Sequence, residues 1–338
     1  MLPDSYTCRL CPRNCGVPRS FGRGGRDSAR GGGPGGVAGY CGETGELRIA
    51  AASIHRGEEP PLSGEGGSGT IFVTGCNLGC VFCQNHQISR EGMGAAVSGE
   101  EFARICLALA DRGAENINIV TGSHGIPAIV SGIREARSRG LSLPVLWNSS
   151  AYESPAALSL LEDTVDIYLP DLKTLDGGVA SRFFNAPDYP EHAEKAIRRM
   201  IETRGELRYA AGRGRAFGEG RVLVSGVIIR HLVLPDYLES TREVLRWFGE
   251  NGRGRALFSL MTQYTPVKTG PGNAGAPDRF IRGAEYEKVL RWLEEFEIED
   301  GFYQELVCDS DWLPDFEREN PFSSELSLPV WHWKQGFI

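Results

Sequence analysis

The chain has 338 residues, of which 41% are hydrophobic and 24% charged, and its formal net charge is −8. This length suits one large domain with appendages and a substantial core. No apolar stretch reaches the roughly 18 residues of a membrane span, and the first residues lack the basic and apolar regions of a signal peptide. We therefore expect a cytoplasmic protein without a membrane partner. The negative charge argues against nucleic acid as a partner, because phosphate binding depends on clustered Lys and Arg.

Nine cysteines do not make a disulfide scaffold in a chain of this length, and seven of them fall into two tight groups. The first group reads CxxCxxxC and gains a fourth member after 25 intervening residues; its members are Cys8, Cys11, Cys15 and Cys41. Four thiolates can complete a tetrahedral zinc site or an auxiliary iron–sulfur cluster. The sequence does not distinguish between zinc and an iron–sulfur cluster here, and independent structural cysteines are a third interpretation. The insert at residues 21–36 has few apolar residues and is predicted to be a mobile loop.

From about residue 69 onward, strand-like apolar segments alternate with amphipathic helical segments. The strand candidates are residues 70–74, 116–121, 143–148, 165–170, 222–230 and 256–262. Helical periods fill the gaps, as in residues 100–113, where Phe102, Ile105, Cys106 and Leu109 share one face. Cys106 is thus interpreted as a packing residue. Six strand and helix pairs predict parallel strands with right-handed crossovers, hence an open partial barrel or a doubly wound sheet.

The second cysteine group follows the first strand candidate, in the run GCNLGCVFCQN, and consists of Cys76, Cys80 and Cys83. Three thiolates at CxxxCxxC spacing can hold three irons of a four-iron, four-sulfur cluster and leave the fourth iron open. The glycine turn between Gly75 and Gly79 lets the backbone curl so that the sulfurs converge. Zinc is the rival interpretation, although structural zinc takes four ligands and this run offers three. Buried structural cysteines are the third.

The same run, with an aromatic residue before its last cysteine, resembles the signature of the radical S-adenosylmethionine (SAM) enzymes. Within that superfamily the chain is most similar to the branch related to pyruvate formate-lyase activating enzyme. The likeness is carried by CRLCPRNCGVPR, by GTIFVTGCNLGCVFCQN, by the segment from NINIVTGSH to DIYLPDLK and by IIRHLVLP, which together cover most of residues 8–265. It implies that the open iron chelates the amino and carboxylate groups of SAM. Reductive cleavage then yields a 5'-deoxyadenosyl radical that removes a hydrogen atom from the substrate.

The resemblance also selects the fold, an α/β partial (β/α)6 radical SAM barrel over residues 61–298. A small N-terminal four-cysteine metal-binding unit with its linker would occupy residues 1–60, and a C-terminal extension residues 299–338. The extension is rich in aromatic residues, among them Trp312, Trp331 and Trp333. Closing the open side of the barrel, forming a partner surface and simple packing are the three roles open to it.

Polar residues at the carboxyl ends of the predicted strands are the candidates for ligand contacts, because ligands gather there in parallel α/β folds. After the second strand, Gly122 and Ser123 stand where the superfamily usually shows a Gly-Gly-Glu type segment that contacts the SAM amino group. His124 follows, as a ligand contact or a helix cap. After the third strand, Asn148 and Ser150 lie in a turn similar to the Asn-Gly turn near the SAM ribose and carboxylate.

The fourth strand ends in Asp171 and Lys173, which match the activating-enzyme pattern directly. Two residues apart on a strand end, they point the same way and suit a zwitterionic amino-acid group, with a surface ion pair as the alternative. Arg230 and His231 close the fifth strand, again in a matching run. The complete set of cofactor-binding candidates is Phe82, Gln84, Asn85, Gly122, Ser123, Asn148, Ser150, Asp171, Lys173 and His231, with Gln263 and Tyr264 as candidates for the substrate cavity.

These observations predict a radical SAM oxidoreductase with a [4Fe-4S] cluster and SAM as cofactors and a flavodoxin- or ferredoxin-like reductant. Two enzyme subclasses compete: an activase that installs a glycyl radical on a partner protein, and an enzyme that modifies a peptide, RNA or small molecule directly. The alternative outside enzymology is an iron–sulfur or zinc binding module for electron transfer or regulation.

Overall fold

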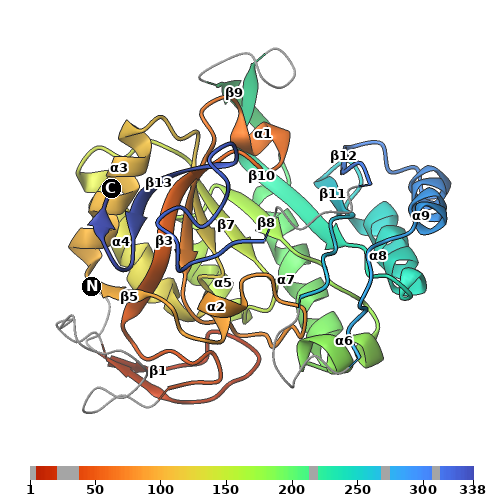
Figure 1. Ribbon diagram of the computed structural model, residues 1–338, viewed down its shortest axis with the longest axis horizontal. Helices are drawn as coiled ribbons and strands as arrows, with labels where there is room; N and C mark the ends of the chain where they lie inside the picture. Colours follow the sequence, from red (N-terminus) through yellow and green to blue (C-terminus); the bar gives the residue numbers. More distant parts are fainter. Residues whose placement is uncertain (1–4, 21–37, 213–219, 268–274, 307–312) are drawn as a thin grey trace.

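A computed structural model describes residues 5–20, 38–212, 220–267, 275–306 and 313–338 (Figure 1). The glycine-rich insert at residues 21–36 and Trp312, both named above, lie outside the described residues. The strands are β1 (Ser5–Thr7), β2 (Pro18–Ser20), β3 (Leu47–His55), β4 (Ser68–Val73), β5 (Ala95–Val97), β6 (Ile117–Val120), β7 (Val145–Ser149), β8 (Ile167–Pro170), β9 (Arg208–Ala211), β10 (Arg221–Leu232), β11 (Leu257–Met261), β12 (Gly301–Tyr303), β13 (Ser327–His332) and β14 (Gly336–Phe337). The helices are α1 (Pro60–Ser63), α2 (His86–Ser89), α3 (Gly99–Asp111), η1 (Ser123–Gly125), α4 (Ile126–Ser138), α5 (Pro155–Leu161), α6 (Gly177–Phe184), α7 (Tyr189–Arg204), α8 (Leu238–Asn251) and α9 (Gly283–Glu295).

A large sheet organises the described part of the chain, with the order β12-β11-β10-β8-β7-β6-β4-β3-β13-β14. From β4 to β12 every neighbouring pair is parallel. Helices connect these strands, as right-handed βαβ units require. The six predicted strands are confirmed as β4, β6, β7, β8, β10 and β11, and the α/β fold class is confirmed with them.

Side chains alternate between the two faces of the parallel strands, as the pleat demands. On β8, Ile167 and Leu169 join an apolar cluster together with Ile228 of β10. This cluster lies on the face of the sheet opposite the helices, which we call the inner face. Tyr168 between them points outward into the large core beneath the helices, as does Ile229 of β10. The same alternation decides whether a residue at the end of a strand points to the inner face or toward the helices.

Helix α3 shows how the outer layer is built. Ser98 caps it, with its side chain accepting a hydrogen bond from the Glu101 amide. Phe102, Cys106 and the other two residues of the predicted stripe are fully buried, so the packing interpretation of Cys106 is confirmed. The neighbouring helix α4 approaches closely at Gly132, where an added Cβ would lie 2.4 Å from a ring carbon of Phe102.

Antiparallel strands extend one side of the sheet. β3 pairs with β4, and β13 near the C-terminus pairs with β3. Strand β3 was not predicted from the sequence. It is buried on both faces, so residues 47–55 show no regular alternation of polar and apolar residues. The strands β12 and β13 belong to opposite ends of the sheet, so the chain between them travels from one end to the other (Figure 1).

Residues 313–326, which precede β13, form a segment that we call the cap segment. Phe316 is fully buried, and its ring meets the ring of Phe72 on the inner face of β4 at 5.3 Å. Its amide donates to the Gln87 side chain at 2.8 Å, and Trp333 Nε1 donates to its carbonyl at 2.9 Å. Phe322 stands 4.8 Å from the ring of His55. The cap segment therefore covers the inner face beside β3 and β4.

Among the described residues, no helix combines the length and the apolar character needed to cross a bilayer.

Replacing Gly132 by Ala tests the contact between α3 and α4. We expect the overpacking to lower the free energy of unfolding by about 1–3 kcal/mol, more than the gain of up to about 1 kcal/mol in helix propensity. Urea unfolding followed by circular dichroism measures it. The control Gly99→Ala lies at the start of α3 in open space and should change stability by less than about 0.5 kcal/mol. Equal effects of the two substitutions would contradict the close packing.

Candidate active site

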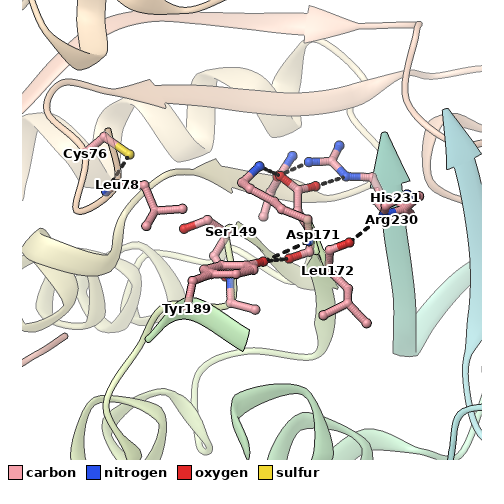
Figure 2. Close-up of polar contacts among 12 residues, drawn as sticks. Cys76, Leu78, Ser149, Asp171, Leu172, Tyr189, Arg230 and His231 are labelled. Atoms are coloured by element: carbon pink, nitrogen blue, oxygen red, sulfur yellow. Dashed lines mark hydrogen bonds and ion pairs between the residues drawn. The ribbon is translucent and has the colours of Figure 1, made fainter. Parts of the chain in front are cut away.

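The cysteine loop leaves the carboxyl end of β4 through a turn that only glycine allows. Gly75 has φ +85°, and a Cβ on it would lie 2.4 Å from Cγ of Glu43. The loop then carries Cys76, Cys80 and Cys83, all partly buried. The Leu78 amide lies 3.4 Å from Sγ of Cys76 (Figure 2), and the Ser89 hydroxyl lies 3.3 Å from Sγ of Cys83.

Cys76 and Cys80 stand in an environment that disfavours free thiolates. Burial first, and then the neighbouring Cys83, raise the pKa of Cys76 to about 11 and that of Cys80 to about 12. Lys173 opposes the rise at both cysteines. In the described part of the chain, no three His, Cys, Asp or Glu side chains gather as they would around one metal ion. A four-iron cluster asks for a different arrangement, because each of its thiolates binds a different iron.

The loop opens onto a cavity of about 280 Å³ inside the barrel. Eight of the predicted residues line it, namely Cys80, Phe82, Cys83, Gln84, Asn85, Asn148, Asp171 and Lys173. Of the two candidates for the substrate cavity, Gln263 lines it and Tyr264 does not. The remaining wall combines the polar residues His55, Glu58 and Arg230 with apolar side chains from the strands and from Pro314 and Phe322 of the cap segment.

A buried ion network forms one wall of this cavity. Lys173 Nζ donates to Oδ2 of Asp171 at 2.8 Å, and Arg230 Nε donates to Oδ1 of the same carboxylate at 2.9 Å (Figure 2). Arg230 also donates to the side-chain oxygen of Asn148 at 2.6 Å, and it lies 3.6 Å from the Glu58 carboxylate. Four segments of the barrel thus meet at one guanidinium group. The pairing of Asp171 with Lys173 is a cavity feature rather than a surface ion pair.

The network keeps its members charged despite burial. Burial alone would raise the pKa of Asp171, but Arg230 and Lys173 outweigh it and hold that pKa below its usual range. Burial would lower the pKa values of Lys173 and Arg230, and Asp171 more than reverses that in both. At neutral pH the Asp171 carboxylate and the two cations Lys173 and Arg230 therefore all stay charged in this wall.

Four predicted cofactor contacts do not line the cavity. His231 points outward from β10 because its neighbour Arg230 points inward. Its Nδ1 bonds the Leu172 carbonyl at 2.7 Å and its Nε2 the Thr241 hydroxyl at 3.0 Å, so both ring nitrogens already have protein partners. The other three are Gly122, which is packed against Ile129 and Trp147; Ser123, whose hydroxyl donates to Glu153 at 2.6 Å; and Ser150, whose hydroxyl lies 3.5 Å from Asn77.

Three acidic residues in and around this site were missed by sequence reasoning. Glu58 reaches the cavity just before α1, far along the chain from Arg230. Glu59 beside it is buried, and burial raises its pKa. Glu153 supplies a buried carboxylate beside Ser123 where the motif had shown none, and burial raises its pKa as well. The one local signal was the position of Glu153 shortly after the third strand.

Two members of the first cysteine group, Cys15 and Cys41, lie close to each other, and Cys41 contacts the cysteine loop. A Cβ on Gly39 would lie 3.2 Å from Sγ of Cys15 and 3.6 Å from Sγ of Cys41, so these two sulfurs meet around one point of the backbone. Arg19 donates to Sγ of Cys41 at 3.3 Å. The Cys41 carbonyl in turn accepts a hydrogen bond from the Cys76 amide at 3.3 Å. The two cysteine groups are therefore in direct contact through the backbone.

Comparison with known proteins gives the following similarities. Residues 70–212 match the Radical SAM superfamily. An uncharacterized protein of Methanocaldococcus jannaschii is 27% identical over 301 residues, or 86% of this chain and 75% of that protein. The crystal structure of Streptococcus suis SuiB bound to S-adenosylmethionine aligns with a TM-score of 0.48 and 15% identity over 68% of this chain, which spans 48% of SuiB. A domain of pyruvate-formate lyase-activating enzyme from Bacteroides vulgatus aligns with a TM-score of 0.37 and 11% identity over 53% of this chain and 91% of that domain.

Asp171→Asn tests the ion network. Removing the carboxylate takes away the ion-pair partner of buried Lys173 and leaves Arg230 with Glu58 as its remaining carboxylate, and we expect the free energy of unfolding at pH 7 to fall by about 3–5 kcal/mol. The folded pKa of Asp171 lies below its unfolded value of about 3.9, so the stabilisation is present above that pH and is lost as pH falls through the folded pKa. The deficit of the variant should accordingly shrink in acid. Denaturant titrations between pH 7 and pH 3 measure it.

The matched control is Asp163→Asn, which removes an exposed carboxylate. It should leave stability within about 0.5 kcal/mol of wild type. A deficit in Asp171→Asn that stays constant with pH would contradict the charge argument.

Proposed function

We propose that the chain is a SAM-dependent radical enzyme, on the premise that residues 70–212 match the Radical SAM superfamily. Cys76, Cys80 and Cys83 would hold a [4Fe-4S] cluster, and the cavity beneath them would hold SAM and substrate. One observation supports this above the others: two of the three thiols and the charged pair Asp171 and Lys173 open into the same cavity. A reactive centre and a seat for a zwitterion are thereby brought side by side.

The bound cluster would supply one electron for the reductive cleavage of SAM, which gives methionine and the 5'-deoxyadenosyl radical that takes a hydrogen atom from the substrate. The chain itself supplies binding and orientation. The Lys173 ammonium spends one donor on Asp171, which leaves donors for a carboxylate in the cavity. Asn148 is held in place by Arg230, so its side chain is already oriented toward the cavity before any ligand enters.

The apolar wall would exclude solvent from the reacting groups. Phe82 lies between the cysteines and packs edge-on against Phe184 at 5.8 Å and Tyr264 at 5.4 Å. The opposite side carries Phe72 and Phe322, whose ring centroids are 5.4 Å apart. Aromatic side chains in this position exclude solvent from the reacting groups and offer no easily oxidised thiol.

The cavity favours a small molecule or a short peptide as the substrate, which the enzyme would modify directly. Pro314 and Phe322 of the cap segment line it, so the chain itself occupies part of the space beside the candidate SAM site. Activation of a glycyl-radical enzyme is the second candidate, supported by the resemblance to the activating-enzyme branch. An anaerobic pull-down that recovers a glycyl-radical enzyme would favour activation, whereas a metabolite that raises 5'-deoxyadenosine turnover would favour direct modification.

Two accessory roles belong to the same proposal. A flavodoxin- or ferredoxin-like protein in the cytoplasm would deliver the electron. Cys8, Cys11, Cys15 and Cys41 would hold a zinc ion or a second iron–sulfur cluster, and burial of Cys8 and Cys41 suits either ligand set. Metal analysis of a variant with Cys76, Cys80 and Cys83 all replaced by Ala identifies that metal, because only the N-terminal group then remains.

Cys80→Ala tests the enzymatic proposal. Anaerobically reconstituted wild type should show a four-iron absorption spectrum and release 5'-deoxyadenosine from SAM under dithionite, and the variant should fall to the background rate because it lacks one cluster ligand. Chromatography of the nucleoside product measures the rate. Cys106→Ala is the matched control, since it removes a thiol buried in α3 and should retain the cluster and the activity. Product formation by Cys80→Ala at the wild-type rate would refute the assignment.

A further inference from the structure

Two arginines hold successive carbonyl groups of the cysteine loop. Arg13 Nε donates to the Asn77 carbonyl at 3.0 Å, and Arg90 donates to the Leu78 carbonyl. Both carbonyls lie between Cys76 and Cys80. Arg13 comes from the turn that carries the first cysteine group, whereas Arg90 directly follows α2. The loop is therefore gripped from two sides by groups from different parts of the chain.

Tyr40 joins the two arginines. The Arg13 guanidinium stands over the Tyr40 ring at 3.8 Å from its centroid, a distance typical of a strong cation–π contact, and Arg90 lies 5.5 Å from the same centroid. The Tyr40 hydroxyl accepts a hydrogen bond from Asn185 Nδ2 at 2.8 Å. Neither guanidinium can therefore move without disturbing a ring that is itself held at its outer end.

The fit between this group and the loop is tight. A Cβ on Gly79 would lie 2.7 Å from Nη2 of Arg90 and 2.7 Å from the hydroxyl of Tyr40. Arg13 Nη2 is buried without a hydrogen-bond partner among the described residues. A buried guanidinium nitrogen with unspent donors is costly unless negative charge lies near it. The three thiolates that would bind the cluster on the adjoining loop would make it anionic and provide that charge.

We propose that Arg13, Tyr40 and Arg90 form a clamp through which the N-terminal four-cysteine unit positions the cysteine loop and raises the reduction potential of its cluster. This inference rests on the proposed function, because it requires the cluster at Cys76, Cys80 and Cys83. The physical reason is Coulombic. Reduction adds a negative charge to the cluster, and cations held nearby in a partly desolvated setting favour the reduced state. These are positioning residues, since in the structure they contact the loop rather than the cavity.

Arg13→Gln removes one charge of the clamp together with the guanidinium that contacts the Asn77 carbonyl and the rings of Tyr40 and Tyr152. The anaerobically reconstituted full chain is titrated potentiometrically, and the reduced cluster is followed by electron paramagnetic resonance, using the signal that Cys80→Ala lacks. We expect the midpoint potential to shift to more negative values while most of the iron is retained. Arg13→Lys keeps the charge and should recover most of the shift. Arg9→Gln, which removes an exposed arginine of the same turn, is the matched control and should leave the potential nearly unchanged.

A purely structural role would change iron content or thermal stability but not the potential of the cluster that remains. If Arg13→Gln and Arg9→Gln shift the potential equally, the clamp is overturned.

Should Arg13→Gln fail to fold, Tyr40→Leu takes its place, because it removes the ring between the two arginines and keeps both charges. In that variant the proposal requires a mobile loop, seen as faster alkylation of the iron-free cysteines, and an unchanged alkylation rate overturns it. Wild type without a cluster at these cysteines would instead refute the proposed function itself.

Discussion

The carboxylate of Asp171 is the contact on which the candidate site depends. It lies at the end of β8 and accepts hydrogen bonds from Lys173 on the same strand end and from Arg230 on β10. Arg230 continues to Asn148 on β7 and to Glu58 before α1. Buried charges are tolerated only when they are paired and hydrogen-bonded. One carboxylate thus joins neighbouring strands and leaves a charged, preformed wall inside the barrel.

The other walls of the cavity come from distant parts of the chain. The cysteine loop follows β4 and is held by the segment that carries the first cysteine group. The Cys76 amide donates a hydrogen bond to the Cys41 carbonyl, and Arg13 donates one to the Asn77 carbonyl. The cap segment contributes Phe322 from near the C-terminus. The two ends of the chain therefore meet the barrel at the same functional region, one behind the thiols and one across the cavity.

Much of the candidate site could be predicted from local patterns. The predictions that differ from the structure share one cause, which is that local patterns do not show how distant segments meet. Spacing by two on a strand end predicted that Asp171 and Lys173 point the same way, and both line the cavity. The same alternation separates the neighbours Arg230 and His231, and the matching run of letters in which they stand did not say which of them faces inward. Glu58 was missed because its partner Arg230 lies far along the chain, where no local spacing connects the two.

The sequence by itself determined the strand order along the chain, the helix faces and the cysteine spacing, because alternation and ligand spacing depend on neighbours a few residues apart. Only the tertiary structure decided which residues line the cavity, that β3 and β13 extend the sheet, and that Arg13 and Tyr40 reach the cysteine loop. These contacts join segments separated by dozens to hundreds of residues. Their partners are chosen by the path of the folded chain and by the need to pair buried charge, which no short sequence window contains.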